Sequence, residues 1–254
     1  MKTNAMKAKI LAGEPAFGLS LMFASPQLVE IAAAAGFDWV LIDCEHGAIS
    51  TESVEMMCIA ADACGITPIA RPRSRDALEI LQVLDRGAMG VQIPHVNTAE
   101  QARAAVRACK FHPEGNRSLA GSTRPQNYDV PGRPEGYYAT ANREILVCAQ
   151  LEDREAIANV DEILQVDGID VFFIGPSDLS ATMGHPGDPK AEPVAKAVEE
   201  TLATIAAAGK AAGMPAAANA VASVRDKGVL YIYTHLPKLI DSAARAYFAA
   251  ARGA

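Results

Sequence analysis

Apolar residues along this chain gather into eight short runs, and a segment with helical periodicity follows each run. Most of the runs are continuous rather than alternating, which is typical of strands covered on both faces. The runs predict strands at Phe17–Phe23, Trp39–Cys44, Pro68–Arg71, Gly90–His95, Ile145–Leu151, Val171–Ile174, Met214–Ala218 and Leu230–Thr234. The chain is therefore predicted to repeat a unit of one strand and one helix.

Helix start and stop signals lie between these strands. The candidate N-caps are Ser25, which precedes Pro26, then Ser50, Ser74 and Thr98, and the candidate helix ends are Gly36, Gly65 and Gly87. Gln101 completes a capping box with Thr98. The helix after the sixth strand is expected to be split, with a turn at 177–183 and a helix at 192–208. A final amphipathic helix is expected at 237–251.

Eight such units in 254 residues predict an α/β protein with a single (β/α)8 barrel, the TIM-barrel fold. No shift in composition divides the chain, so residues 1–254 are interpreted as one domain. A doubly wound open sheet is the alternative that the pattern leaves open. The segment 112–142 is rich in Gly, Pro, Asn and Arg and too long for an idle loop. It is interpreted as a lid or an oligomer contact.

Composition narrows the choice of partner and compartment. The formal net charge of −7 gives a field that repels polyanions, so nucleic acid is not an expected partner. The apolar runs are far shorter than the roughly 20 residues of a bilayer span, which argues against a membrane protein. Residues 1–12 lack the hydrophobic segment of a secretory signal, so a cytoplasmic location is expected. The five cysteines have no zinc-like spacing and are expected to be reduced core residues.

Polar side chains follow the predicted strands at one rim of the predicted barrel, where enzymes of this fold place their active sites. They are Asp43, Glu45, His46, Arg71, His95, Gln150, Glu152, the run Gly175 to Asp178, and His235. Glu152 and Asp178 follow neighbouring strands and offer the hard oxygen ligands that Mg²⁺ prefers. The alternative is that both are acids placed at helix starts, where they favour the helix dipole.

Arg71 and His46 have two interpretations each. The guanidinium of Arg71 suits a carboxylate or an enolate, but it also suits a structural ion pair with Asp85 or Glu45. His46 suits a general base whose tautomer is set by Asp43, three residues earlier, although a histidine after a strand is also a common loop residue.

Lysine placement bears on the type of carbonyl chemistry. A Schiff-base aldolase requires a desolvated lysine inside the barrel. Five lysines, Lys110, Lys196, Lys210, Lys227 and Lys238, fall in helices or at their ends, and no predicted strand contains a lysine. Imine chemistry is therefore not expected.

Four stretches of the chain resemble one family in its own order. They are Glu30 to Gly47 (EIAAAAGFDWVLIDCEHG), Leu84 to Gly90 (LDRGAMG), Gln150 to Glu152 (QLE) and Phe173 to Ser180 (FIGPSDLS). Together these stretches resemble the HpcH/HpaI aldolases, the metal-dependent class II pyruvate aldolases. The resemblance covers about residues 15–215.

The resemblance implies a (β/α)8 barrel that assembles into homohexamers, built as trimers of dimers, with the last helix packed on a neighbouring subunit. The residues that match family roles are Glu152 and Asp178 as ligands of a divalent cation (Mg²⁺, Mn²⁺ or Co²⁺), Arg71 as the pyruvate-binding arginine, His46 as the base, and Asp85 and Asp43 as acids that support the histidine or arginine. Gln150 matches a residue near the metal, and Gly175, Pro176 and Ser177 match the backbone that holds the pyruvate carboxylate. Trp39 matches a structural tryptophan.

The implied activity is that of a class II aldolase that cleaves or forms 4-hydroxy-2-oxo acids, through a pyruvate or hydroxypyruvate enolate and an aldehyde. An oxaloacetate decarboxylase or macrophomate-synthase-like lyase is an alternative that uses the same enolate site. A non-catalytic carboxylate-binding barrel is a second alternative. The chain departs from the family pattern at His112 to Ser118 and at Tyr233 to His235. His235 and Arg124 are candidates for tuning the choice of substrate.

Overall fold

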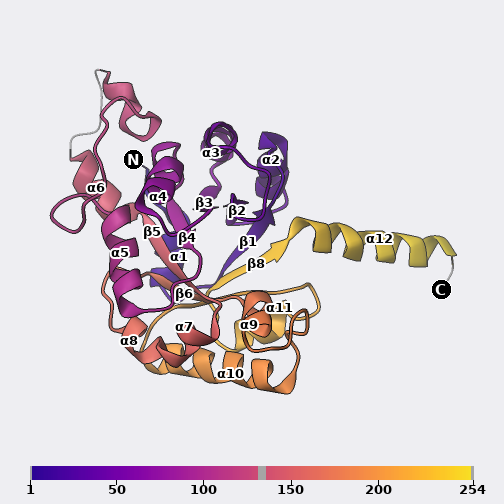
Figure 1. The fold of residues 1–254 in the computed structure, drawn as a ribbon. Coiled ribbons are helices and arrows are strands. Elements are labelled where there is room, and N and C mark those ends of the chain that lie inside the picture. The colour runs from indigo at the N-terminus through magenta and orange to yellow at the C-terminus, as the bar shows by residue number, and fades with distance from the viewer. Residues whose placement is uncertain (1, 131–135, 253–254) are drawn as a thin grey trace.

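A computed structural model describes residues 2–130 and 136–252 of the chain. Within these residues, eight parallel strands close into a barrel in chain order, each paired with the next and β8 paired with β1 (Figure 1). The strands are β1 (Ala16–Leu21), β2 (Trp39–Asp43), β3 (Thr67–Arg71), β4 (Gly90–Ile93), β5 (Leu146–Leu151), β6 (Val171–Ile174), β7 (Ala212–Pro215) and β8 (Tyr231–His235). The barrel prediction is confirmed, and the open-sheet alternative is excluded.

Predicted strand ends differ from the observed ends where proline or backbone torsion intervenes. β4 stops at Ile93, because Pro94 follows and His95 has a positive φ of 51°. β7 begins at Ala212, before the predicted start, and ends at Pro215, which has no N–H to donate. β4 and β7 therefore both end earlier along the chain than the apolar pattern predicts.

Helices and turns alternate with the strands. They are α1 (Ala5–Leu11), α2 (Pro26–Ala34), α3 (Thr51–Cys64), α4 (Ala77–Asp85), α5 (Ala99–Cys109), the 3₁₀ segment η1 (Arg124–Asp129), α6 (Tyr137–Glu144), α7 (Arg154–Ala158), α8 (Val160–Leu164), α9 (Pro176–Thr182), α10 (Glu192–Ala207), α11 (Val221–Asp226) and α12 (Leu236–Arg252). The split helix after β6 and the N-caps Ser25, Ser50 and Thr98 are confirmed. The N-cap prediction for Ser74 is wrong, because its hydroxyl accepts from the amide of Asp76, and Asp76 itself is the N-cap of α4.

The barrel interior is packed around Trp39, whose indole is fully buried. A Cβ at Gly18 would lie 2.3 Å from the Trp39 ring, so glycine is needed on β1 for the indole to fit. Met6 and Ile10 of α1 join the same cluster of buried side chains, and the amine of Lys7 donates to the carbonyl of Ile145. Helix α1 therefore closes the amino end of the barrel and leaves the carboxyl end of the strands as the open end. The structural role expected for Trp39 is confirmed.

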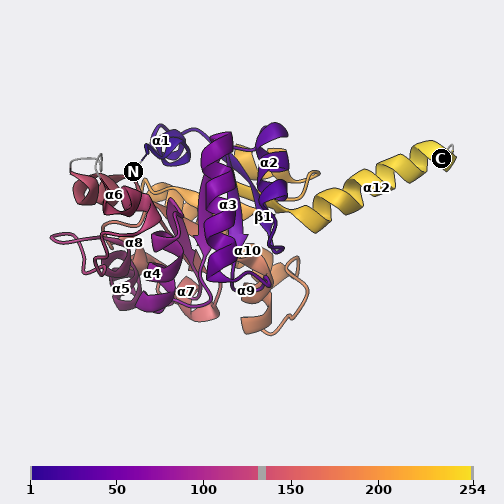
Figure 2. The same cartoon turned by 90° about the horizontal axis from the view of Figure 1, so that it is seen from above.

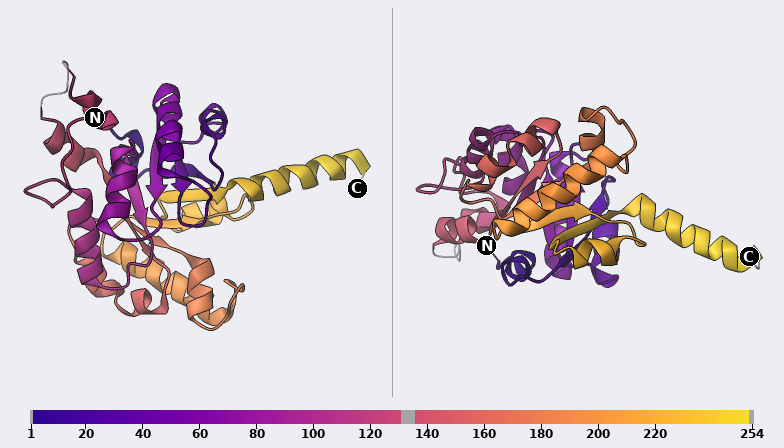
Figure 3. Two further views of the ribbon diagram at one scale, coloured as in Figure 1. Left: turned by 45° about the horizontal axis from the view of Figure 1, so that its top comes forward. Right: turned by 90° about the horizontal axis from the view of Figure 1, so that it is seen from below.

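The last helix, α12, leaves the barrel and extends away from it in every view (Figures 1, 2 and 3). None of its described side chains is buried, and its apolar side chains Ile240, Tyr247 and Phe248 are exposed. Among the residues that the structure describes, no helix combines the length and the apolarity that crossing a membrane requires.

The described part of the segment 112–142 lies on the opposite side of the molecule from α12 (Figures 1 and 2). Asn142 bonds back to Phe111, and Arg124 of η1 pairs with Asp62 of α3. These contacts are at the amino end of the barrel, so the described residues do not form a lid over the open end. Residues 131–135 of the segment lie outside the described residues.

The expectation that all five cysteines are core residues is correct for four. Cys44, Cys58, Cys109 and Cys148 are buried, whereas Cys64 is exposed at the last turn of α3. All five are free thiols. Cys64 lies on the outward face of an amphipathic helix, which the apolar residues around it in sequence do not reveal.

Candidate active site

Asp43 and Arg71 form a buried ion pair at the open end of the barrel. They are register partners at the ends of β2 and β3. Arg71 Nε donates to Asp43 Oδ1 over 3.0 Å, and Arg71 Nη2 donates to Asp43 Oδ2 over 2.5 Å. Burial lowers the pKa of Arg71, but the hydrogen bond and negative charge of Asp43 outweigh it and raise that pKa overall. A permanent positive charge is therefore held at the rim.

Asp43 also shapes the turn that follows β2. Its Oδ1 accepts from the amides of Glu45 and His46, over 3.1 and 3.3 Å. A Cβ at Gly47 would lie 2.2 Å from the carbonyl oxygen of Asp43, so this tight turn requires glycine. The expectation that Asp43 sets the tautomer of His46 is not met, because the carboxylate is occupied by Arg71 and two backbone amides. Asp43 supports the arginine and only the backbone of His46.

Glu45 lies between Arg71 and the two histidines of the rim. Its Oε2 is 3.2 Å from Arg71 Nε and 3.8 Å from His46 Nε2. Burial raises the pKa of Glu45, and the charges of Arg71 and the histidines oppose that rise. The ion pair of Arg71 with Glu45 is thus present, while His46 keeps about half of its side chain exposed to solvent.

Glu152 follows β5 and is 1% exposed. Gln150 Nε2 donates to its Oε2, and Gln150 Oε1 in turn accepts from Gln92. Tyr231 donates to Gln92 over 3.0 Å, which completes a hydrogen-bonded chain from the barrel interior to the rim. Burial raises the pKa of Glu152 to about 7. The expectation that Gln150 lies beside the metal-site acid agrees with this contact.

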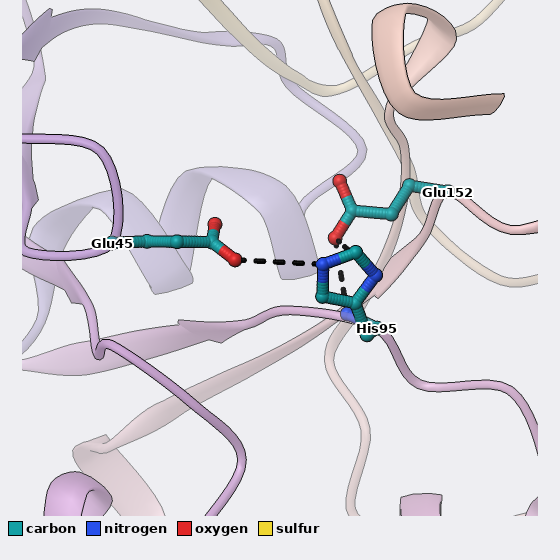
Figure 4. Close-up of side chains that lie close together, drawn as sticks. All are labelled: Glu45, His95 and Glu152. Atoms are coloured by element: carbon teal, nitrogen blue, oxygen red, sulfur yellow. Dashed lines mark hydrogen bonds and ion pairs between the residues drawn. The ribbon is translucent and has the colours of Figure 1, made fainter. Parts of the chain in front are cut away.

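Glu45, His95 and Glu152 converge from three different strand ends (Figure 4). One ligand-capable atom of each lies within 4.8 Å of the other two. His95 donates its backbone N–H to Glu152 Oε1 over 3.0 Å, and its Nδ1 is 2.9 Å from Asp153 Oδ2. The sequence placed His95 on the rim but assigned it no role. Its signal, a histidine after a strand end, is ordinary until the fold brings Asp153 beside it.

Gly175, Pro176, Ser177 and Asp178 connect β6 to the first turn of α9. A Cβ at Gly175 would lie 2.8 Å from Glu152 Cβ and 2.9 Å from its Oε2, so glycine lets this connection pass directly over the buried carboxylate. Asp178 is partly buried and three residues beyond that contact. It is not a member of the cluster formed by Glu45, His95 and Glu152.

The structure does not bring Asp85 and Arg124 to this rim. Asp85 ends α4 and accepts from Arg117 Nη2 over 2.6 Å. Arg124 pairs with Asp62, and a Cβ at Gly87 would lie 2.8 Å from Arg124 Nη1. Helix α4 ends where β4 begins, at the amino end of the barrel, so its last residue cannot reach His46 or Arg71 of the same chain. The expected support from Asp85 and substrate tuning by Arg124 are therefore not formed within one chain.

His235 ends β8 and lies near the arginine. Its ring is perpendicular to that of Tyr233, with centroids 5.3 Å apart. Burial and the charge of Arg71 lower the pKa of His235, which favours a neutral ring. His235 therefore stands at the carboxyl end of β8, on the same rim as Arg71.

No strand that the structure describes carries a lysine. Burial and the charge of Lys7 lower the pKa of Lys110, but its amine donates to the carbonyls of Asn142 and Ile145 at the amino end. The open end instead combines buried carboxylates with a fixed guanidinium. Such an arrangement can hold a cation and stabilise negative charge that develops on a small anionic substrate.

Residues 17–231 match the family model described as HpcH/HpaI aldolase/citrate lyase. The chain is 42% identical over 221 residues to a 2-keto-3-deoxy-L-rhamnonate aldolase of Klebsiella pneumoniae subsp. pneumoniae, covering 87% of this chain and 82% of that protein. It is 40% identical over 233 residues to a hydroxypyruvate/pyruvate aldolase of Roseovarius nubinhibens, covering 91% and 89%. A crystal structure of an HpcH/HpaI aldolase/citrate lyase family protein from Burkholderia cenocepacia superposes with a TM-score of 0.92 at 31% identity, covering 98% and 100%.

Proposed function

Because this chain belongs to the HpcH/HpaI aldolase/citrate lyase family and is a carbon–carbon lyase, we propose a specific reaction for it. It cleaves 4-hydroxy-2-oxo acids to pyruvate or hydroxypyruvate and an aldehyde, and it catalyses the reverse condensation. The observation that carries this proposal is the convergence of the buried carboxylate of Glu152 with the fixed guanidinium of Arg71 at one rim. Together the carboxylate and the guanidinium can bind a cation and an anionic substrate in one site.

The donor set fits a divalent cation. Glu152 is buried, and its carboxylate lies in one cluster with that of Glu45, so two like charges converge at this rim. We assign Glu152 and Asp178 as ligands of Mg²⁺, Mn²⁺ or Co²⁺, since carboxylate oxygens suit these ions. When bound, the cation supplies a Lewis acid for the carboxylate and keto oxygens of the 2-oxo acid and stabilises its enolate.

Arg71 binds the same end of the substrate. Its hydrogen bonds to Asp43 use Nε and Nη2, so Nη1 is the nitrogen left to approach the keto oxygen. The hydrogen bonds to Asp43 orient the guanidinium of Arg71 before substrate binds. The positive charge of the guanidinium then stabilises the oxyanion that forms as the carbon–carbon bond is cleaved. Gly175 lies directly against Glu152, and Gly175, Pro176 and Ser177 are assigned to the carboxylate of the 2-oxo acid.

His46 acts on the other half of the substrate. Its half-exposed ring stands on the rim and is free to reach a hydroxyl in the open end of the barrel. In the cleavage direction it takes the proton of the 4-hydroxyl as the aldehyde forms. In the condensation direction it returns a proton to the new alkoxide.

The entrance favours acidic or hydroxylated aldehydes. Arg73 and Arg75 follow Arg71 on the same loop, and His235 contributes a neutral ring beside it. These groups offer hydrogen-bond donors and positive charge outside the enolate site. His235 is the position at which this chain selects its aldehyde.

A second copy of this chain covers α12. The helix is about 26 Å long and exposes Tyr247 and Phe248, which are 70% and 50% exposed. An apolar cavity of about 330 Å³ lies over β1 and β8, beside Val221 of α11 and Leu239 near the start of α12. It is lined by Phe17, Phe37, Val221, Ile232 and Leu239, among others. An exchanged α12 fills this space, and the assembly in this proposal is a homohexamer built as a trimer of dimers.

The test measures products separately. Metal-loaded protein is incubated with a 4-hydroxy-2-oxo acid, and pyruvate and aldehyde are assayed separately. We expect the two products to be released in equal amounts. Chelation abolishes release and added Mg²⁺, Mn²⁺ or Co²⁺ restores it. Glu152→Gln lowers turnover at least about a hundredfold, whereas Glu155→Gln, an exposed acid on α7, leaves it unchanged.

Two outcomes contradict the proposal. Full cleavage by chelated protein, or by Glu152→Gln, rules out the metal assignment. Pyruvate release from oxaloacetate without any aldol cleavage identifies a decarboxylase that uses the same enolate site.

A further inference from the structure

His95 is held at the rim by its backbone before its side chain is considered. It follows Pro94 after β4 with a φ of 51°, and its N–H donates to Glu152 Oε1 over 3.0 Å. The carbonyl of His95 accepts from Arg75 over 3.0 Å. Backbone torsion and these two hydrogen bonds fix the Cα, so the ring projects between Glu45 and Glu152 (Figure 4).

Asp153 determines which ring nitrogen faces the site. His95 Nδ1 lies 2.9 Å from Asp153 Oδ2. An ionised carboxylate only accepts hydrogen bonds, so Nδ1 carries the hydrogen and Nε2 of the neutral ring carries the lone pair. A carboxylate that binds the remote nitrogen of a histidine in this way is typical of histidines that ligate metals, because it fixes the ring and increases its basicity.

His95 Nε2 faces carboxylate oxygen at a distance that suits a shared ion. It is 3.6 Å from Glu45 Oε1, too long for a hydrogen bond. Two ligands each about 2.1 Å from one cation are about 3.0–3.4 Å apart for angles near 90–110°. A movement of a few tenths of an ångström is enough to bring both atoms to one ion.

Glu45 keeps one oxygen for such an ion. Its Oε2 lies 3.2 Å from Arg71 Nε, whereas Oε1 is the oxygen that faces His95 Nε2. A cation between Glu45 and Glu152 would offset the burial of these two carboxylates in one cluster.

We propose that His95 supplies a nitrogen ligand to the divalent cation held by Glu152, with Asp153 as the positioning residue that orients its ring. This inference rests on the proposed function, since it concerns the same cation. It adds to two acids an imidazole, which binds Co²⁺, Ni²⁺ and Zn²⁺ more readily than Mg²⁺. The site therefore discriminates against Mg²⁺ more strongly than an all-oxygen site would.

The test uses Mn²⁺ as a spectroscopic probe. Electron spin-echo modulation of the Mn²⁺-loaded protein shows coupling to ¹⁴N, and labelling with [¹⁵N]histidine changes it to ¹⁵N frequencies. His95→Asn abolishes the nitrogen coupling and weakens Mn²⁺ binding at least about tenfold. Asparagine suits this position because it tolerates a positive φ. Asp153→Asn keeps the coupling but weakens binding about tenfold.

His46→Asn is the matched control, since His46 stands on the same rim near Glu45. It keeps the nitrogen coupling. In Co²⁺ and Mg²⁺ titrations the preference for Co²⁺ falls at least about tenfold in His95→Asn and is unchanged in His46→Asn.

Absence of histidine nitrogen coupling in the wild-type protein overturns the inference without any variant. Coupling that survives in His95→Asn, or that disappears in His46→Asn, also overturns it. If His95→Asn loses turnover but keeps both the Mn²⁺ affinity and the nitrogen coupling of the wild-type protein, His95 contacts the substrate and not the metal ion. In each of these cases the protein can still cleave the substrate in a reaction that depends on Glu152. Failure of the inference about His95 is therefore distinguishable from failure of the proposed function.

Discussion

Arg71 and Asp43 are register partners on neighbouring strands, and two parallel hydrogen bonds join the guanidinium of one to the carboxylate of the other. The pair is buried, so the fork is oriented before any substrate binds. A lysine would keep the charge but could not make both bonds.

Arg71→Lys is therefore expected to lower kcat for cleavage about a hundredfold, a loss comparable to removal of one donor to an oxyanion. Pyruvate release under saturating substrate measures the effect. Arg143→Lys is the control, because Arg143 is 67% exposed and lies on α6 beside Glu144, just before β5 at the amino end of the barrel. Equal activity of the two variants would remove Arg71 from the catalytic site.

Borohydride reduction in the presence of pyruvate is expected to leave the protein mass unchanged. No described strand carries a lysine, and the buried amine of Lys110 is engaged by two carbonyls at the amino end. Imine formation on a barrel strand is therefore not expected. Mass spectrometry of the intact chain checks this, and an adduct on any lysine would disprove the enolate mechanism.

Phe248→Asp is expected to reduce the mass of the assembly in solution. The change places a charge on the exposed apolar face of α12, which the proposed assembly buries against a second copy. Light scattering after size-exclusion chromatography measures the mass. Ser242→Asp puts the same charge at another exposed position of α12 and is expected to keep the wild-type assembly. Unchanged mass in both variants would show that α12 does not join subunits.

One thiol per chain is expected to react with an aromatic disulfide reagent in the native protein, and five after denaturation. Cys64 is exposed, whereas burial raises the pKa of Cys109 to about 12 and that of Cys58 well above its ordinary value. A thiol must ionise and be reachable to react. Absorbance of the released thiolate counts the reactive groups, and Cys64→Ser should remove the native reaction. Rapid reaction of a second thiol in the native state would contradict the burial pattern.

The predicted rim and the observed rim agree where residues follow strand ends directly. Asp43, Arg71 and Glu152 needed only the barrel topology to be placed, since all parallel strands end at one face. Asp85 and Arg124 were misplaced because they follow helices or loops, whose path depends on packing. The resemblance left Asp43 to support either the histidine or the arginine, and the register of β2 with β3 pairs it with Arg71.

The order of apolar runs and caps by itself determined a barrel and the set of polar side chains at its rim. This is possible because strand and helix periodicities are local, and short connections leave few topologies. Only the tertiary structure decided which of these side chains meet. The contact of His95 with Asp153 joins residues 58 positions apart in the sequence. The amphipathic pattern of α12 predicts a helix but not its direction, and in the structure this helix extends away from the barrel (Figure 1). Distances between strand ends are set by barrel closure, which no local pattern encodes.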